Sequence, residues 1–256
     1  MNLLNMIAAS GNRVPTGTEE GVLKRASFTL LDLHAKCNYA AFLRQSIPYK
    51  EYQEKSEPNP NADRGTELHD ATEQFVKGYL PSLPKEIKYQ REYIESCRKM
   101  VDEGKKVYAE NPWYFDREWT PQEKEGHRLV MKLDQYYFET PNIMVIDEWK
   151  SGKAIGNEAK HVRQTKFYAT GAFMMFPELQ LINTYVRYFD QNFVLPRNYT
   201  REQSMAFHRT FDNQLRLFWH DTKYQPRPSR AACGICPYNK MNLDGSYFCA
   251  YGVRND

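Results

Sequence analysis

The stretch Val145-Ile-Asp-Glu-Trp-Lys-Ser-Gly152 joins an apolar run to an acidic pair, a lysine and a Ser-Gly turn. It predicts a buried strand, in which side chains two residues apart point to the same side. Glu148 and Lys150 therefore share one face, and Asp147 lies on the other. A carboxylate beside an ammonium at a strand end can hold a divalent cation and position a water or neutralise charge on a phosphate. Taken alone, such a triplet more often marks a solvated strand end.

The composition is that of a folded protein and does not identify a partner. The chain has 256 residues, of which 41% are hydrophobic and 14% aromatic, which is enough for a sizeable core. Mean hydropathy is −0.75. No run of about 18 apolar residues occurs, so we expect no membrane span. Residues 1–10 lack a basic segment, so we expect no signal peptide and a cytoplasmic location.

A second acidic residue is predicted to lie near the first strand. The segment His127–Phe138 predicts a strand or bent strand that contains Asp134, and Thr140-Pro-Asn142 predicts a turn. The two strands then form a hairpin. Because neighbouring strands lie about 5 Å apart, we expect Asp134 and Glu148 to be able to share one cation.

Helical periodicity predicts most of the remaining elements. The residue pattern places one further strand at 179–190, and Thr200-Arg-Glu-Gln203 is a capping box that begins a helix ending near His220. Predicted helices cover 27–43, 63–77, 85–110 and 160–176, and a loop covers 45–63. His69 lies on the second helix, where a lone histidine is more often structural than a ligand. Gln164 and Tyr168 are four residues apart and share one face of the fourth helix.

The segment 150–166 is locally basic. It holds five basic residues against one acid, Glu158. A basic segment beside a cation site suits a phosphate backbone. An ordinary solvated helix face would have the same composition.

The five cysteines are an odd number and unevenly placed. Without a secretion signal, metal ligation or free thiols are more common than disulfides. Cys97 has no nearby partner and is expected to be a free thiol. By itself, Cys37 on an apolar helix face would be a small core residue.

The order of these motifs resembles the PD-(D/E)xK nuclease superfamily, and in particular its RecB-like branch with the CRISPR-associated exonucleases and the AddB nuclease domain. The matching motifs are Arg64-Gly-Thr-Glu-Leu-His69, Lys132-Leu-Asp134, Asp147-Glu-Trp-Lys-Ser-Gly152 and Gln164-Thr-Lys-Phe-Tyr168. The resemblance implies an α/β fold with a restriction-endonuclease-like core, in which helices flank a central mixed sheet. It spans nearly the whole chain.

The resemblance also implies roles for the residues of these motifs. His69, Asp134, Glu148 and the backbone carbonyl of Trp149 would bind Mg²⁺ or Mn²⁺. Lys150 would position the attacking water and stabilise charge on the phosphate. Gln164 and Tyr168 would orient this lysine or contact the DNA backbone.

Two departures from the superfamily pattern concern the acidic residues. The proline of the superfamily's name is absent before Asp134. In addition, Asp147 adjoins Glu148, so either could be the second acid. Strand alternation selects Glu148, because it lies on the same side as Lys150.

In this branch, one cysteine before the core and three after it hold a 4Fe-4S cluster, and Cys37, Cys233, Cys236 and Cys249 take those places. Such a cluster would staple the first helix to the tail. The twelve residues between Cys236 and Cys249 are more than the family pattern has. A Zn²⁺ site with the same four ligands remains an alternative, as do cysteines that are merely buried.

The resemblance thus implies a metal-dependent DNA nuclease, an exonuclease acting on single-stranded or end-opened DNA in repair, recombination or phage or CRISPR-type processing, in a bacterial or phage-infected cell. We expect a single nuclease domain over residues 1–256, with a core at about 64–220 and a cysteine-clipped subdomain from about 27–45 and 226–256. No Gly-x-x-x-x-Gly-Lys-[Ser/Thr] motif occurs, so any helicase would be a separate partner.

Two other functions remain open from the sequence. The first is a catalytically inactive nucleic-acid-binding or recombination-accessory protein with a structural Cys₄ metal site. The second is a structural or interaction protein whose cysteines hold a zinc staple.

Overall fold

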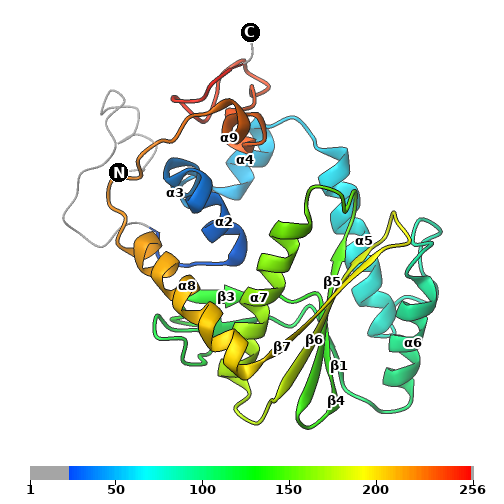
Figure 1. Ribbon diagram of the computed structural model, residues 1–256. Coiled ribbons are helices and arrows are strands. Elements are labelled where there is room, and N and C mark those ends of the chain that lie inside the picture. The colour runs from blue at the N-terminus through cyan, green and yellow to red at the C-terminus, as the bar shows by residue number, and fades with distance from the viewer. Residues whose placement is uncertain (1–22, 255–256) are drawn as a thin grey trace. The chain divides into compact units, whose positions relative to one another are not determined.

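The computed structural model describes residues 23–254, in two compact units (Figure 1). The first unit combines Met1–Pro58 with Asp212–Asp256, and the second is the continuous stretch Asn59–Phe211. Both segments expected to form the cysteine subdomain, 27–45 and 226–256, fall in the first unit. The segment for which we expect no signal peptide lies outside the described residues. Within residues 23–254, no helix has both the length and the apolar character that a membrane span requires.

The second unit is built on a five-stranded mixed sheet with the order β1-β4-β5-β6-β7. Its strands are β1 (Val107–Ala109), β4 (Gln135–Thr140), β5 (Ile143–Lys150), β6 (Leu181–Tyr188) and β7 (Val194–Thr200). The β5–β6 pair is parallel and the other pairs are antiparallel. A separate antiparallel pair joins β2 (Trp113–Phe115) to β3 (Leu129–Met131).

Helices cover both faces of this sheet (Figure 1). Helices α5 (Pro60–Val76) and α6 (Arg91–Asp102) lie on one face, and α7 (Glu158–Met175), which connects the parallel strands, lies on the other. The predicted α/β fold, a central mixed sheet flanked by helices, is therefore confirmed. The α8 helix (Arg201–Trp219) begins in this unit, and its last turns belong to the first unit.

The first unit is helical in the part of the chain that the structure describes. Its helices are α2 (Phe28–Lys36), α3 (Asn38–Ser46), α4 (Tyr49–Lys55), α9 (Arg230–Gly234) and the 3₁₀ turn η1 (Pro237–Asn239).

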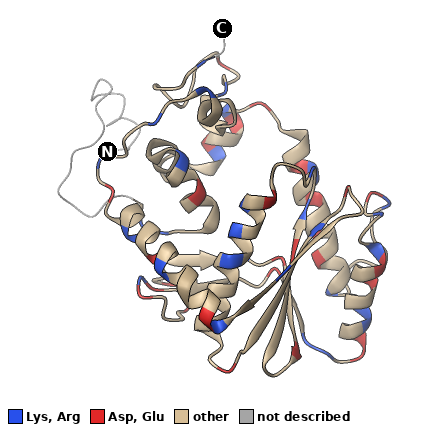
Figure 2. Ribbon diagram, in the orientation of Figure 1, with Lys and Arg blue, Asp and Glu red and all other residues tan. Residues whose placement is uncertain are grey.

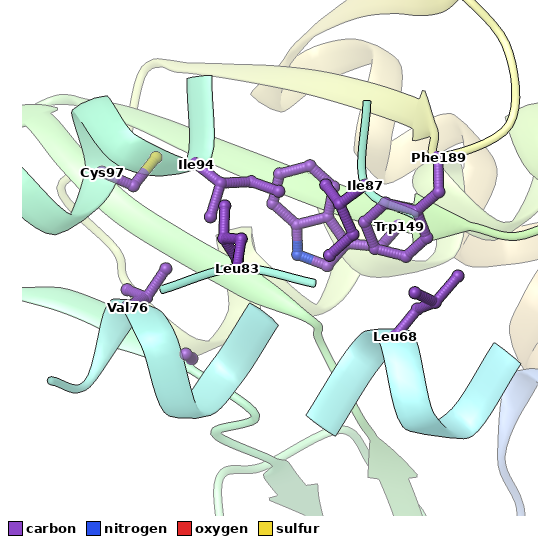
Figure 3. Packing of buried hydrophobic residues seen from close by; sticks show 9 residues of the cluster. Leu68, Val76, Leu83, Ile87, Ile94, Cys97, Trp149 and Phe189 are labelled. Atoms are coloured by element: carbon purple, nitrogen blue, oxygen red, sulfur yellow. The ribbon is translucent and has the colours of Figure 1, made fainter. Parts of the chain in front are cut away.

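The face of the sheet toward α5 and α6 carries a large hydrophobic cluster (Figure 3). Trp149 of β5 stacks on Phe189, with ring centroids 5.7 Å apart, and Leu68 of α5 and Ile94 of α6 belong to the same cluster. Each such side chain contributes about 1.5–3 kcal/mol when it is fully buried. Packing of this one tryptophan thus anchors both helices to the central strand.

Asp147 is on the same face as Trp149 and is completely buried. Its two carboxylate oxygens accept hydrogen bonds from Arg187 Nε (2.7 Å), the Tyr93 hydroxyl (2.7 Å) and Gln135 Nε2 (3.2 Å). The Arg187 guanidinium also lies 3.4 Å from the ring centroid of Tyr93. Burial raises the pKa of Asp147, although the charge of Arg187 opposes this effect. The carboxylate is thus fully engaged in a structural ion pair.

The structure corrects four of the predicted elements. The first helix is two helices, because Cys37 is extended (φ −159°) between α2 and α3. The predicted loop at 45–63 contains α4, and α5 begins at Pro60. The helix expected at 85–110 is shorter, since α6 ends at Asp102 and β1 follows. Asp134 lies between β3 and β4 rather than within a strand.

The capping box at the start of α8 is confirmed. The N–H of Thr200 donates to Gln203 Oε1 (3.1 Å), and the N–H of Gln203 donates to Thr200 Oγ1 (3.4 Å). These reciprocal bonds satisfy two N–H groups that have no partner within the helix.

Removing the charge of Asp147 should destabilise the protein, because it leaves Arg187 buried without a counter-charge. We expect Asp147→Asn to lower the free energy of unfolding by roughly 3–5 kcal/mol, measured by urea titration. The control is Asp102→Asn, which breaks a more exposed ion pair with Arg98 on α6 and should cost at most about 1 kcal/mol. Equal losses for the two variants would contradict the role given to the buried pair.

Candidate active site

The site lies at one end of the sheet's inner strands, where β5 ends and β4 begins. Asp134, just before β4, accepts a hydrogen bond from the N–H of Trp149 through Oδ2 (2.6 Å). Its Oδ1 lies 3.2 Å from Nδ1 of His69 on α5. Since the indole of Trp149 belongs to the hydrophobic cluster, this residue contributes its backbone, not its side chain, to the site.

Helix α5 approaches the end of β5 closely at Gly65, one turn before His69. A Cβ at Gly65 would lie 2.8 Å from Oγ of Ser151, which is closer than side-chain atoms normally pack. Arg64 reinforces the approach through two hydrogen bonds to Asp190 (3.0 and 2.5 Å). Asp190 in turn accepts from the N–H of Gly152 (2.6 Å). These contacts fix the position of α5, and thus of His69, relative to β5.

On the α7 side of the sheet, Glu148 receives two donors at the same oxygen. Lys150 Nζ and Gln164 Nε2 both donate to Glu148 Oε1, the second over 2.6 Å. Gln164 Nε2 also donates to the hydroxyl of Tyr168 (2.8 Å), which donates to the carbonyl of Lys132 (2.6 Å). This chain of hydrogen bonds connects α7 to β5 through Glu148, and to the segment between β3 and β4 through Lys132.

The other oxygen of Glu148, Oε2, is buried and has no hydrogen-bond partner. Burial and the nearby charge of Asp134 raise the pKa of Glu148 to about 7. A buried, unpartnered carboxylate oxygen beside a second carboxylate is costly without a positive charge. The residues present therefore fit a divalent cation, which favours carboxylate oxygens.

His69 and Asp134 stabilise each other's charged forms. Burial alone would lower the pKa of His69, but the hydrogen bond and charge of Asp134 outweigh it and raise this pKa. Burial alone would raise the pKa of Asp134, but His69 and Lys150 outweigh it and hold this pKa below its usual value. Only the neutral imidazole can ligate a cation, so a cation at this site would have to displace the proton that His69 shares with Asp134.

Glu110 is a further site residue that the sequence did not reveal. His69, Glu110 and Asp134 offer ligand atoms that all lie within 4.8 Å of one another. The N–H of Glu110 donates to the carbonyl of Asp134 (2.9 Å), and its backbone has a positive φ of 48°. Burial and the charge of Asp134 raise the pKa of Glu110 to about 7. Recognising the short strand Val107-Tyr108-Ala109 before Glu110 would have indicated this residue, but we predicted that segment as helix.

The second unit contains all the predicted site residues of the nuclease motifs, namely His69, Asp134, Glu148, Trp149, Lys150, Gln164 and Tyr168. Among the described residues, the ligand atoms within 4.8 Å of one another are those of His69, Glu110 and Asp134, without Glu148. The remaining predicted residues, the four cysteines Cys37, Cys233, Cys236 and Cys249, lie in the first unit.

Three of the four cysteines accept hydrogen bonds from the backbone at their sulfur atoms. The N–H of Arg227 donates to Cys37 Sγ (3.4 Å), and backbone N–H groups also donate to the thiols of Cys236 and Cys249. Burial raises the pKa of both these thiols, and the neighbouring cysteines raise it further. Among residues 23–254, however, these cysteines form no group of three whose sulfur atoms all lie within 4.8 Å of one another.

A mixed sheet with an aspartate, a Glu-x-Lys strand and a helical Gln-xxx-Tyr at one end is the arrangement expected of a nuclease with a restriction-endonuclease-like core. A sequence model of the PD-(D/E)XK nuclease superfamily matches residues 25–241. The chain therefore belongs to this superfamily, as the resemblance of its motifs predicted. No curated protein sequence matches the chain.

Solved structures give more distant likenesses. The chain is similar to SSO0001, with a TM-score of 0.43 and 13% identity over 92% of this chain and 91% of that one. It is also similar to LHK-Exo, an alkaline exonuclease from Laribacter hongkongensis, with a TM-score of 0.38 and 11% identity over 77% and 86% of the two chains. The structure of LHK-Exo in complex with dAMP has a TM-score of 0.37 and 13% identity to this chain, over 77% of this chain and 87% of that one.

A larger side chain at Gly65 should push α5 away from the loop after β5. We expect Gly65→Val to lower the free energy of unfolding by about 1–3 kcal/mol through overpacking, measured by urea titration, and Ser151→Gly to restore part of the loss. The matched control is Ala62→Val, at an exposed position of the same helix. If the two valine variants were equally stable, the close approach at Gly65 would not be a constraint.

Proposed function

We propose that the protein is a divalent-cation-dependent DNA nuclease, and that it acts as an exonuclease on single-stranded or end-opened DNA. The nuclease class rests on the superfamily. The observation that supports the cation is the buried Oε2 of Glu148, which has no partner and adjoins Asp134. DNA as substrate, and a role in repair, recombination or phage or CRISPR-type processing, follow from the resemblance.

His69, Asp134, Glu148 and the backbone carbonyl of Trp149 would hold the cation, Mg²⁺ or Mn²⁺, and Glu110 is a further ligand that the structure adds to this proposal. The bound cation would neutralise charge on the phosphate and lower the pKa of a bound water. The imidazole of His69 favours Mn²⁺ over Mg²⁺, because Mg²⁺ prefers oxygen ligands alone.

Lys150 is the residue that acts on the phosphate in this proposal. Its ammonium would donate to a phosphate oxygen while water adds to phosphorus and the bond to the leaving oxygen breaks. Glu148 fixes the ammonium at the end of β5, and Gln164 and Tyr168 fix Glu148. Gln164 and Tyr168 therefore act through Glu148 in this proposal. The resemblance had implied instead that they orient the lysine directly or contact the DNA backbone.

Basic side chains on α7 and in the loop before it would guide the DNA backbone. Lys153 and Lys160 are exposed, and Figure 2 shows basic residues on α7. Arg163 and Lys166, by contrast, lie over the rings of Phe211 and Phe207, at 5.9 and 4.6 Å from the ring centroids. The basic segment is therefore partly solvated and partly packed.

Loss of the lysine should abolish most of the activity. We expect Lys150→Ala to reduce the rate of single-stranded DNA degradation in Mn²⁺ by about 10²–10³, the usual cost of removing one preorganised donor to a developing charge. The control is Lys88→Ala, at an exposed lysine of the same unit. Degradation of no form of DNA by the wild-type protein, or an unchanged rate in Lys150→Ala, would overturn the proposed function and leave an inactive DNA-binding protein as the alternative.

We also propose that Cys37, Cys233, Cys236 and Cys249 hold a 4Fe-4S cluster. Backbone N–H groups donate to the sulfurs of three of them, and for Cys236 and Cys249 these bonds oppose the rise in pKa that burial causes. A single tetrahedral Zn²⁺ with Zn–S bonds of about 2.3 Å would need all its sulfur atoms within roughly 4 Å of one another. Among residues 23–254 no three of these sulfurs lie within 4.8 Å of one another, so the choice of a cluster over zinc follows from the resemblance.

The metal content of anaerobically purified protein tests this assignment. We expect a broad visible absorption band and about four irons per chain, both lost in Cys236→Ser and retained in Cys97→Ala. Cys97 is the matched control, because it is buried in the other unit between Ile94 and its neighbours. One zinc per chain would overturn the cluster and show a zinc staple in its place. A metal-free protein would show that the thiols are ordinary buried groups.

A further inference from the structure

A small aromatic pocket lies in the first unit, and one of its residues, Tyr238, adjoins the cysteines, because its carbonyl accepts a hydrogen bond from the N–H of Cys249 (2.9 Å). It has a volume of about 250 Å³ and is lined by Arg44, Ile47, Tyr49, Tyr52 and Tyr238. Tyr49 and Tyr52 are three residues apart on α4, so their side chains lie on one face of the helix. The pocket thus combines three phenol rings with one guanidinium, and no carboxylate is among its lining residues.

Two of the three tyrosines are held rigidly by their neighbours. Tyr238 is only 2% exposed, and its hydroxyl is hydrogen-bonded to Arg44. Tyr52 is stacked on Phe248 at 5.5 Å and packs edge-on against Tyr238 at 5.6 Å. These contacts fix the shape of the pocket before any ligand arrives, which reduces the entropy lost on binding.

The third tyrosine, Tyr49, is 65% exposed. Its hydroxyl accepts a hydrogen bond from Gln53 on the same helix (3.0 Å), while most of its ring remains in contact with solvent. A large aromatic surface left exposed at the rim of a preformed pocket is a feature of binding sites rather than of a packed core.

Aromatic faces together with an arginine are the side chains that bind unpaired bases. Bases that are not stacked in a duplex stack on tyrosine rings, and guanidinium groups stack on bases or donate to their acceptor atoms. A volume of about 250 Å³ is large enough for one base. A phosphate alone would not stack on the tyrosine rings. An acidic peptide would not need three of these rings.

We propose that this pocket binds a single unpaired nucleobase, which α4 and the guanidinium of Arg44 hold outside the catalytic unit. The base would come from a DNA strand or from a free nucleotide, since both present the same ring. The DNA source rests on the proposed nuclease function. Pocket binding itself does not, because it requires neither the cation nor the residues of the second unit.

Photocrosslinking locates the bound base directly. The probe is a single-stranded DNA oligonucleotide with one 5-iododeoxyuridine, irradiated with the full-length protein in EDTA so that no strand is cut. We expect the crosslinked peptide, identified by mass spectrometry, to contain Tyr49 or Tyr52. Crosslinks confined to other parts of the chain would overturn the proposal.

Affinity measurements test the stacking. We expect Tyr49→Ala to bind the same oligonucleotide about 5- to 150-fold more weakly, the range found for the loss of one base–aromatic stack, and Tyr49→Phe to bind like the wild type. The matched control is Tyr79→Ala, at an exposed tyrosine of the second unit. Unchanged binding by Tyr49→Ala would overturn the proposal.

Competition with dAMP distinguishes the two sources of the base. If dAMP prevents the crosslink at Tyr49 at concentrations comparable to those of the oligonucleotide, the pocket is a nucleotide site; if only oligonucleotides compete, it is a strand site. Both results support base binding. Failure of the nuclease proposal is separate, because it would appear as absent strand degradation in Mn²⁺ with the crosslink at α4 retained.

Discussion

The buried ion pair between Asp147 and Arg187 is the interaction on which the geometry of the second unit depends. Two acidic residues follow each other on β5, and a shift of register by one residue would exchange their faces. Since Arg187, Tyr93 and Gln135 engage both oxygens of Asp147, this carboxylate is committed to the side of α6. Its neighbour Glu148 must then face α7. The structural ion pair thus determines which acid enters the site.

The two oxygens of Glu148 differ in their hydrogen bonding, and this difference organises the site. Lys150 and Gln164 share Oε1, so Oε2 remains without a partner in a region where burial and Asp134 both disfavour its charge. The acids of the site therefore lie together without a complete hydrogen-bond network. The close packing of α5 at Gly65 adds His69 to this cluster. Acidic groups gathered around an unpartnered buried oxygen are typical of a preorganised binding site.

Strand alternation was sufficient to predict the central strand and to place Glu148 and Lys150 on one face of it, because these depend on local periodicity, whereas the α/β fold was implied by the family resemblance. Glu110 could not be found in this way, since it meets Asp134 only through the pairing of β1 with β4, which is remote in sequence. The break at Cys37 was equally hidden, because the apolar pattern continues through it. The tyrosines of α4 lay in a segment that three prolines marked as loop. Misses therefore occurred where long-range contacts override local pattern.

The first unit is assembled from both ends of the chain, and this has a consequence during synthesis on the ribosome. The second unit is one continuous stretch and is complete once residue 211 has emerged. The thiol of Cys37, however, meets the N–H of Arg227, which lies 190 residues further along the chain. At about 5–20 residues per second, α2 and α3 wait roughly 10–40 s for their partner segment. The nascent chain therefore carries a complete second unit while the apolar faces of α2 and α3 still lack the segment that follows residue 211.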